Sequence, residues 1–228
     1  LVRAFVQARM SSRRFPGKAL APFLGRPIVA HVIASVSRVV PRSRIVVLTS
    51  NETSDDPLAS FAQTLGVGVF RGGLEDVFGR FRACMRRHPC GSFLRICGDS
   101  PLLDSGIVSA VAAAGRASGA DLATNVFPRT FPKGQSAELL DSEAFLAVDP
   151  RELTDRQREH VTPFFYENPR RFAIVNVESC RPSWSKVHMD VSVPEDILRL
   201  EKRYPKGLGD LPEFKFRGIS VHGGGAGR

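Results

Sequence analysis

The sequence predicts an α/β fold built on a doubly wound, mostly parallel sheet. In the first half of the chain, short apolar runs typical of buried strands alternate with stretches of helical spacing, which is the pattern of parallel βαβ units. A loop of small and basic residues follows the first run, at the place where open α/β sheets bind ligands. After Asn125 the alternation gives way to a mixed pattern, which indicates a smaller insertion.

Strands and helices alternate strictly before that change. Val2–Val6 is the first strand, and Pro27–Val39 is a helix because its apolar residues recur at a spacing of three and four. The helix Pro57–Leu65 is closed by Gly66, and the helix Leu74–Arg87 is basic and amphipathic. The other elements are the strands Ile45–Leu48, Val67–Phe70, Phe93–Cys97 and Asp121–Thr124 and the alanine-rich helix Ile107–Ala117.

The second half is predicted to hold shorter elements of both kinds. The expected strands are Ala137–Leu140, Phe172–Val177 and Val187–Val191, and the expected helices are Ser142–Val148 and Arg156–Tyr166. Pro194–Arg203 closes the fold as a helix that starts with a proline, where the missing N–H costs nothing.

The composition is that of an ordinary globular protein, since 43% of the 228 residues are apolar and 24% are charged. This length favours one domain, which we place at residues 1–205 with the insertion at about 125–180. An extension over 206–228 ends in a flexible glycine-rich tail. No apolar stretch is long enough to span a membrane, no secretory signal pattern is present, and the four cysteines lack metal-finger spacing. We therefore expect a cytoplasmic protein with reduced thiols and no membrane partner.

The net charge of +9 raises the hypothesis of a nucleic-acid partner. The basic residues are spread along the chain, however, and no aromatic-interleaved RNA-binding signature accompanies them. An anionic small molecule explains the charge at least as well, so we expect no nucleic-acid partner.

The loop after the first strand has the chemistry of a phosphate site. Residues 7–18 contain Arg9, Arg13, Arg14 and Lys18 and no acid. Arginine binds phosphate oxygens bidentately, lysine supplies a compact charge, and a glycine lets the backbone approach the ligand. The loop matches neither the Walker pattern nor the dinucleotide-binding pattern. On chemistry alone, a surface loop with solvated arginines is an equally good interpretation.

Two further segments offer metal ligands. Asp99 follows a predicted central strand beside a glycine, where it is well placed to bind Mg²⁺. The alternative role, capping the next helix, suits Asp104 better because that residue directly precedes the helical pattern. Asp190 and Ser192 share one face of the strand predicted over 187–191, so Asp190 is a candidate second ligand. Glu195 and Asp196 fit a structural role in the first helical turn.

Taken together, these motifs resemble the cytidylyltransferases that activate sugar acids, especially the SpsF-like branch. CMP-Kdo and CMP-sialic acid synthetases are more distant relatives. The resemblance covers residues 2–203 and keeps the family order. It rests on QARMSSRRFPGK at 7–18, RGG with EDV at 71–77, RICGDSPL at 95–102, the segment 124–134 and REHVTP at 158–163.

The resemblance implies a Rossmann-like, GT-A type nucleotidyltransferase fold of three layers, and a reaction in which an acceptor oxygen attacks the α-phosphorus of CTP and displaces pyrophosphate. It makes Arg14, Lys18 and Asp99 catalytic, with Mg²⁺ held by Asp99 and, from the strand argument, Asp190. The implied nucleotide-binding residues are Gln7, Ala8, Arg9, Ser11, Arg14, Lys18, Arg71, Arg95 and Gly98. The implied acceptor-binding residues are Asn125, Arg129, Gln135, Glu138, Glu159 and His160. A homodimer is also expected.

The chain departs from the family pattern at several positions. Ser11 stands where the family has glycine, and Ser192 stands where relatives carry the second metal-binding aspartate. Asp190 lies about 6.5 Å further along the predicted strand. Lys133 and Gln135 replace acidic residues, which favours an anionic acceptor. A glycosyltransferase of related fold and a catalytically impaired nucleotide-binding protein stay open as alternatives, as does a structural role for His160.

Overall fold

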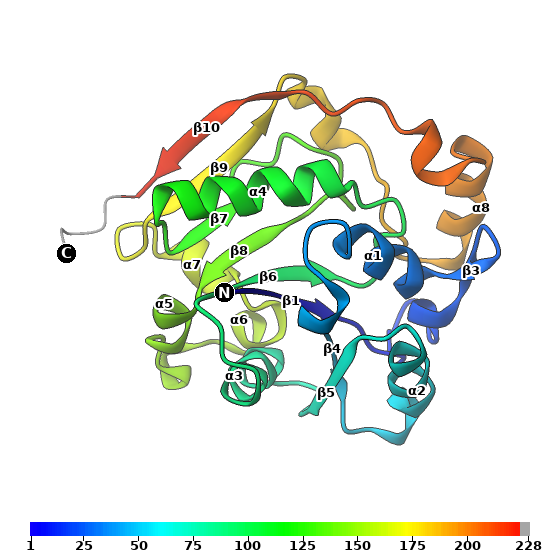
Figure 1. Ribbon diagram of the computed structural model, residues 1–228, viewed down its shortest axis with the longest axis horizontal. Coiled ribbons are helices and arrows are strands. Elements are labelled where there is room, and N and C mark those ends of the chain that lie inside the picture. Colours follow the sequence, from blue (N-terminus) through cyan, green and yellow to red (C-terminus); the bar gives the residue numbers. More distant parts are fainter. Residues whose placement is uncertain (224–228) are drawn as a thin grey trace.

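The computed structural model describes residues 1–223, and its centre is one eight-stranded sheet (Figure 1). Across the sheet the strand order is β10-β9-β7-β8-β6-β1-β4-β5. In chain order these strands are β1 (Val2–Gln7), β4 (Ile45–Ser50), β5 (Gly68–Gly72), β6 (Ser92–Cys97), β7 (Leu122–Thr124), β8 (Glu138–Asp141), β9 (Ile174–Ser179) and β10 (Phe216–His222). A separate hairpin pairs β2 (Pro22–Phe23) with β3 (Arg26–Pro27).

The sheet is mostly parallel, as predicted. β5, β4, β1 and β6 are parallel neighbours, while β8 runs antiparallel between β6 and β7. The segment over residues 125–180 supplies β8 and β9 to this same sheet. Parallel strands bring their carboxyl ends to one edge, so the ends of β1, β4 and β6 lie together.

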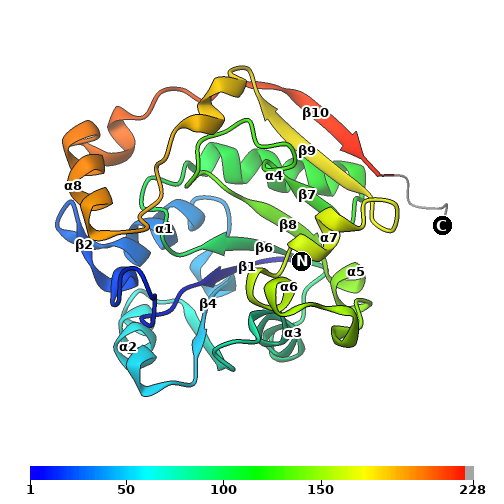
Figure 2. The ribbon, with the colours of Figure 1, turned by 180° about the vertical axis from the view of Figure 1, so that it is seen from behind.

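Helices cover both faces of the sheet and make three layers (Figures 1 and 2). Side chains alternate along β1: Ala4 and Val6 pack with α1, α2 and α4, whereas Phe5 packs on the opposite face with α3, α5 and α7. The helices are α1 (Ile28–Val36), α2 (Asp56–Thr64), α3 (Val77–Arg87), α4 (Ser105–Ser118), α5 (Ser142–Leu146), α6 (Asp155–His160), α7 (Pro163–Glu167) and α8 (Pro194–Arg203). The predicted α/β class is therefore confirmed.

The strand predicted over Val187–Val191 is wrong. This segment makes only an isolated bridge between Lys133 and His188. Its other backbone hydrogen bonds include one from the Val191 N–H to the Asp99 carbonyl, at 2.9 Å. Met189 and Val191 are buried in the core, and burial alone gives the same sequence pattern as a strand.

The single helix predicted over Arg156–Tyr166 is also wrong, because the chain breaks into α6 and α7 at Val161. Pro163 carries no N–H, so a helix continuing through it would lack the hydrogen bond to the Glu159 carbonyl. Val161 has a φ of 71°, and the Thr162 N–H donates to the His160 carbonyl at 2.9 Å. This is the rare, strained form of γ-turn.

The expected extension holds a strand that the sequence did not predict. β10 pairs antiparallel with β9 and forms an edge of the sheet. Gly218 interrupts its apolar pattern, and the pairing is irregular there, as expected for an edge strand. Residues 224–228, where a flexible tail is expected, lie outside the described residues. No helix in the described range 1–223 is both long and apolar enough to cross a membrane.

Candidate active site

A pocket of about 430 Å³ opens at the carboxyl ends of β1 and β6. Four segments line it: the loop after β1, the loop after β6, the first turns of α3 and the last turn of α6. Nine of the residues predicted for the site lie in its wall, namely Gln7, Ala8, Arg9, Arg14, Lys18, Gly98, Asp99, Glu159 and His160. Segments distant in sequence therefore meet at the edge where α/β sheets bind ligands.

The pocket wall is strongly cationic. It holds five basic side chains and two carboxylates. Both carboxylates are paired: Asp99 with Lys18 at 2.8 Å and Glu159 with Arg9 at 3.1 Å. Arg13, Arg14 and Arg80 also line the pocket. Because cations outnumber acids, the pocket suits an anionic ligand.

The loop after β1 is held by a carboxylate from outside it. The Met10 N–H donates to Oδ1 of Asp55 at 2.6 Å, while Oδ2 accepts from Thr49 and from the amide and hydroxyl of Ser50. Asp55 is fully buried. Burial opposes its ionisation, but these donors outweigh that cost and hold the pKa of Asp55 below its usual range. The loop is thereby fixed to β4 through a buried charge.

The loop closes on itself at a glycine. The Gly17 N–H donates to the Met10 carbonyl at 2.8 Å, and Gly17 has a φ of 77°, a conformation that L side chains rarely adopt. Lys18 follows at once and points back across the strand ends. Its Nζ donates to Oδ2 of Asp99 and, at 2.9 Å, to the Val191 carbonyl.

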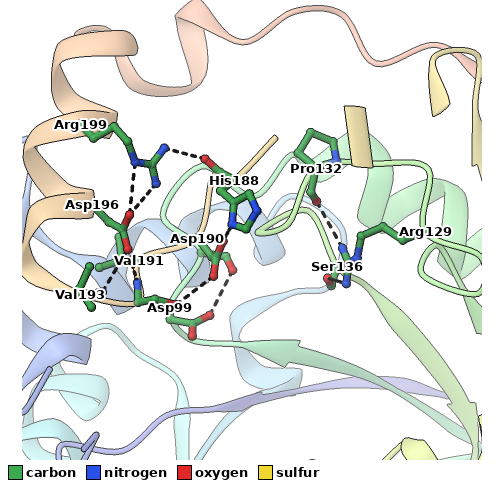
Figure 3. A network of polar contacts seen from close by, with 12 residues as sticks. Asp99, Arg129, Pro132, Ser136, His188, Asp190, Val191, Val193, Asp196 and Arg199 are labelled. Carbon is green, nitrogen blue, oxygen red and sulfur yellow. Dashed lines mark hydrogen bonds and ion pairs between the residues drawn. The ribbon is translucent and has the colours of Figure 1, made fainter. Parts of the chain in front are cut away.

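Asp99 and Asp190 lie beside one another (Figure 3). A hydrogen bond from the Val191 N–H to the Asp99 carbonyl holds their two segments together. Oδ2 of Asp190 accepts from the Ser192 hydroxyl at 3.2 Å. Its other oxygen, Oδ1, lies 4.0 Å from Nδ1 of His188 and is buried without a hydrogen-bond partner in residues 1–223. Asp190 is not in the pocket wall. Asp196 accepts from the Ser192 and Val193 amides, so it has the expected structural role. Within residues 1–223 no three His, Cys, Asp or Glu side chains gather as a metal cluster.

The strained turn at Val161 ends α6 with Glu159 and His160 in the pocket wall. Strained backbone of this kind is often found at functional sites, where surrounding structure holds it in place.

Cys97 also lines the pocket, but burial raises the pKa of its thiol to about 11. A thiol that remains protonated is a poor nucleophile, so we assign Cys97 no catalytic role.

Two of the arginines predicted to bind the nucleotide lie outside the pocket wall. Arg71 donates to Asp56 at 2.6 Å and to the carbonyls of Ser50 and Glu52 at 2.8 Å, so it clamps the loop after β4. Arg95 is buried in an ion pair with Glu138, and its Nε donates to Oε1 of Gln7 at 3.0 Å. Arg95 therefore reaches the pocket only through Gln7.

Most of the residues predicted to bind the acceptor make hydrogen bonds or ion pairs within the fold instead of lining the pocket. Asn125 and Gln135 are fully buried. Asn125 bonds the backbone of residues 135 and 137, and Gln135 bonds the backbone of residues 102 and 104. Arg129 donates to the Ser136 hydroxyl at 3.1 Å. Glu138 forms an ion pair with Arg95. Ser11, which is predicted to bind the nucleotide, has a hydroxyl that is buried without a hydrogen-bond partner in residues 1–223. None of these five lies in the pocket wall.

Sequence reasoning missed Arg80 and Asp55. Arg80 lies one helical turn after Asp76, whose side chain caps α3 by accepting from the Gly79 N–H at 2.9 Å. A basic residue in the first turns of a helix that follows a strand end is the only signal that could have pointed to it. Asp55 carried no signal, because its partners come from separate segments.

The structure matches that of a cytidylyltransferase from Leptospira borgpetersenii with a TM-score of 0.81 and 25% identity, covering 94% of this chain and 99% of that one. The fold and its cationic pocket thus define a protein of the nucleotidyltransferase class. The family profile described as cytidylyltransferase matches residues 4–202. The chain belongs to the cytidylyltransferase family and is an enzyme of that type.

Two curated relatives agree with this assignment. The spore coat polysaccharide biosynthesis protein SpsF of Bacillus subtilis is 25% identical over 214 residues, which are 91% of this chain and 88% of the relative. A 3-deoxy-manno-octulosonate cytidylyltransferase of Aeromonas salmonicida is 34% identical over 157 residues, which are 67% of this chain and 57% of the relative. The resemblance inferred from the sequence motifs is confirmed.

Proposed function

We propose that the protein transfers CMP from CTP to an anionic acceptor of the sugar-acid class and releases pyrophosphate. Membership of the family supports cytidylyl transfer, and the Aeromonas relative is named for such an acid. The observation that carries the proposal is the pocket wall, where five cations face two paired carboxylates. A triphosphate and an acid acceptor both need that excess of positive charge.

Arg9, Arg14 and Lys18 hold the triphosphate in this proposal. All three lie in the loop after β1 and in the pocket wall. In the reaction, the acceptor oxygen forms a bond to the α-phosphorus while the bond to the pyrophosphate oxygen breaks. Negative charge then grows on the departing pyrophosphate, and fixed cations stabilise it.

Asp99 and Asp190 fit a divalent metal such as Mg²⁺. Within residues 1–223, Oδ1 of Asp190 is buried with no hydrogen-bond partner and lies 4.0 Å from Nδ1 of His188, and Oδ1 of Asp99 accepts only from the Ser100 hydroxyl, at 3.2 Å. Mg²⁺ prefers oxygen ligands and often takes one or two carboxylates, with phosphates and water completing its shell. When bound, it would supply charge neutralisation at the phosphate oxygens.

The acceptor lies against the end of α6 in this proposal. Glu159 and His160 are its neighbours, and Glu159 is tied to Arg9 of the phosphate-binding loop. The hydroxyl proton of the acceptor must leave as the new bond forms. The His160 imidazole is our candidate for the base that takes it.

The test is pyrophosphate release from CTP with Mg²⁺ and a panel of sugar acids, with the corresponding neutral sugars as matched acceptors. We expect release with at least one acid and none with its neutral counterpart. UTP, ATP and GTP serve as controls for the nucleotide. CTP binding without release for any acid would favour an impaired nucleotide-binding protein, and release only from a nucleotide sugar would favour a glycosyltransferase.

A further inference from the structure

Arg80 is a buried arginine in the pocket wall for which the proposed reaction has no assigned role. It lies in α3, and only 3% of its surface is exposed. Its side-chain stem packs on the strand end at Gly72, where a Cβ atom would lie 2.9 Å from Cγ of Arg80. The side chain is thus held in place by the strand end before the helix.

The guanidinium has far fewer partners than it can use. Nη2 donates to the Leu74 carbonyl at 3.0 Å, and Nε is buried with no partner in the described residues. No carboxylate of residues 1–223 lies within ion-pair distance of it. Arginine has five N–H donors in a fixed fork and does not deprotonate in proteins.

This charge lacks the compensation that buried ions normally have. Burial lowers the pKa of Arg80, nearby Asp55 and Asp76 oppose that effect, and Arg9 adds to it. Buried charges are found with a counter-ion or a full set of hydrogen bonds, because desolvation otherwise costs more than the site gains. Within residues 1–223 Arg80 has neither, and it lies in the pocket wall.

Arg80 also differs from the other cations of the pocket wall in its ion pairing and in the freedom of its side chain. Lys18 and Arg9 are neutralised by Asp99 and Glu159. Arg13 and Arg14 are exposed, so binding must first restrict their side chains. Arg80 is already immobilised, and a preorganised donor gives up little freedom on binding.

We infer that Arg80 is a phosphate ligand of the nucleotide, supplied by α3 to complete the cationic loop after β1. The inference rests on the proposed function, since it takes the nucleotide as the ligand. Arg80 donates its free N–H groups to phosphate oxygens, and the phosphate provides the counter-charge that the fold omits. It contributes through the charged part of the ligand and not through the base.

The test compares Arg80→Met, Arg80→Lys and Arg86→Met. Methionine keeps the length of the buried stem without the charge, lysine keeps the charge without the fork, and Arg86 is an exposed control on the same helix. Binding of CTP, inorganic pyrophosphate and cytidine is measured by calorimetry, and the melting temperature of each ligand-free protein is recorded.

We expect Arg80→Met to lower the affinity for CTP and for pyrophosphate at least about tenfold, as for loss of a charge-assisted contact. The affinity for cytidine should be unchanged. Arg80→Lys should lose less affinity for CTP and pyrophosphate, and Arg86→Met should lose none. The ligand-free Arg80→Met protein should melt at the wild-type temperature or above, because the substitution removes an uncompensated charge. A structural role would lower that temperature instead.

The inference would be overturned if Arg80→Met bound CTP and pyrophosphate with unchanged affinity. It would also be overturned if the affinity for cytidine fell by the same factor, because that indicates a base contact or a damaged pocket. If Arg80→Met does not fold, the same comparison is made with Arg80→Lys, where a loss confined to the phosphate ligands supports the inference and unchanged affinity contradicts it. Failure of wild-type protein to bind CTP would count against the proposed function, whereas CTP binding that ignores Arg80 counts against this inference alone.

Discussion

Lys18 and Asp99, 81 residues apart in sequence, form an ion pair of 2.8 Å at the carboxyl ends of the central strands. The Lys18 ammonium also donates to the Val191 carbonyl. One cation thereby joins the loop after β1, the loop after β6 and the segment that carries Asp190. The phosphate-binding and metal-binding parts of the proposed site meet at this contact.

Replacing either partner should abolish most of the activity. We expect Lys18→Met and Asp99→Asn each to lower the rate of pyrophosphate release at least about a hundredfold, because fixed charges at the reacting phosphate supply several kcal/mol of transition-state stabilisation. Steady-state release of pyrophosphate measures this. Lys202→Met, on the exposed side of α8, is the control. A rate within a few-fold of wild type for Asp99→Asn would refute its proposed metal role.

The Arg9–Glu159 pair should restrain nucleotide binding. Both side chains are partly exposed, 29% and 43%, so the pair adds at most about 1 kcal/mol to stability. Glu159→Gln removes one of two acids in the wall and frees Arg9, and we expect CTP to bind a few-fold more tightly. The gain should shrink as salt is added, because screening weakens the surplus charge. Calorimetry at low and high ionic strength measures it, and weaker CTP binding in this variant would contradict the expectation.

Asp55 should stabilise the protein in a pH-dependent way. Asp55→Asn places an N–H₂ group against the donors at Oδ1 or Oδ2, and we expect a loss of about 1.5–3 kcal/mol in the free energy of unfolding. Its folded pKa is lowered, so the stabilisation is fully present above the unfolded value of about 3.9. It is lost as pH falls through the folded pKa. Urea unfolding at several pH values should therefore show the wild-type advantage near neutrality and its decrease in acid.

Glu138 should be required chiefly because Arg95 is buried beside it. Oε1 of Glu138 also accepts from the Tyr166 hydroxyl at 2.5 Å. The side chains of Glu138 and Arg95 are 4% and 11% exposed. Glu138→Ala leaves the Arg95 charge unpaired and should cost about 3–5 kcal/mol, whereas an apolar replacement of both partners should recover much of the loss. Urea unfolding of Glu138→Ala and of Arg95→Met with Glu138→Leu tests this. Equal losses in the two proteins would show that the pair is not what makes Glu138 necessary.

Sequence patterns predicted the parallel core and the pocket position well, because both follow from local signals. Apolar runs predict β1, β4 and β6, and Lys18 and Asp99 follow the carboxyl ends of such parallel strands, which meet at one edge of the sheet. Asp104 was expected to cap α4, and its side chain accepts from the Ile107 N–H at 3.0 Å.

The remaining features depend on contacts between distant segments, which one sequence does not encode locally. Val187–Val191 is buried without being a strand, and β10 is a strand with an interrupted pattern. Asn125 and Gln135 are polar and were proposed from the resemblance to the family, yet their hydrogen bonds to the backbone hold them in the core, outside the pocket wall. The homodimer, Mg²⁺ and the acceptor stay predictions.

Asp55 has a consequence for attempts to alter the ligand preference of this protein. The residues proposed to contact the ligand from the loop after β1 are not those that determine the loop's shape, since the Met10 N–H donates to a carboxylate near the start of α2. Replacing residues 8–18 with those of a relative would bring in its basic side chains without the residues that hold the loop in shape. Such an exchange should include residues 49–55 as one unit with the loop, so that the incoming arginines arrive on a backbone of the shape that they require.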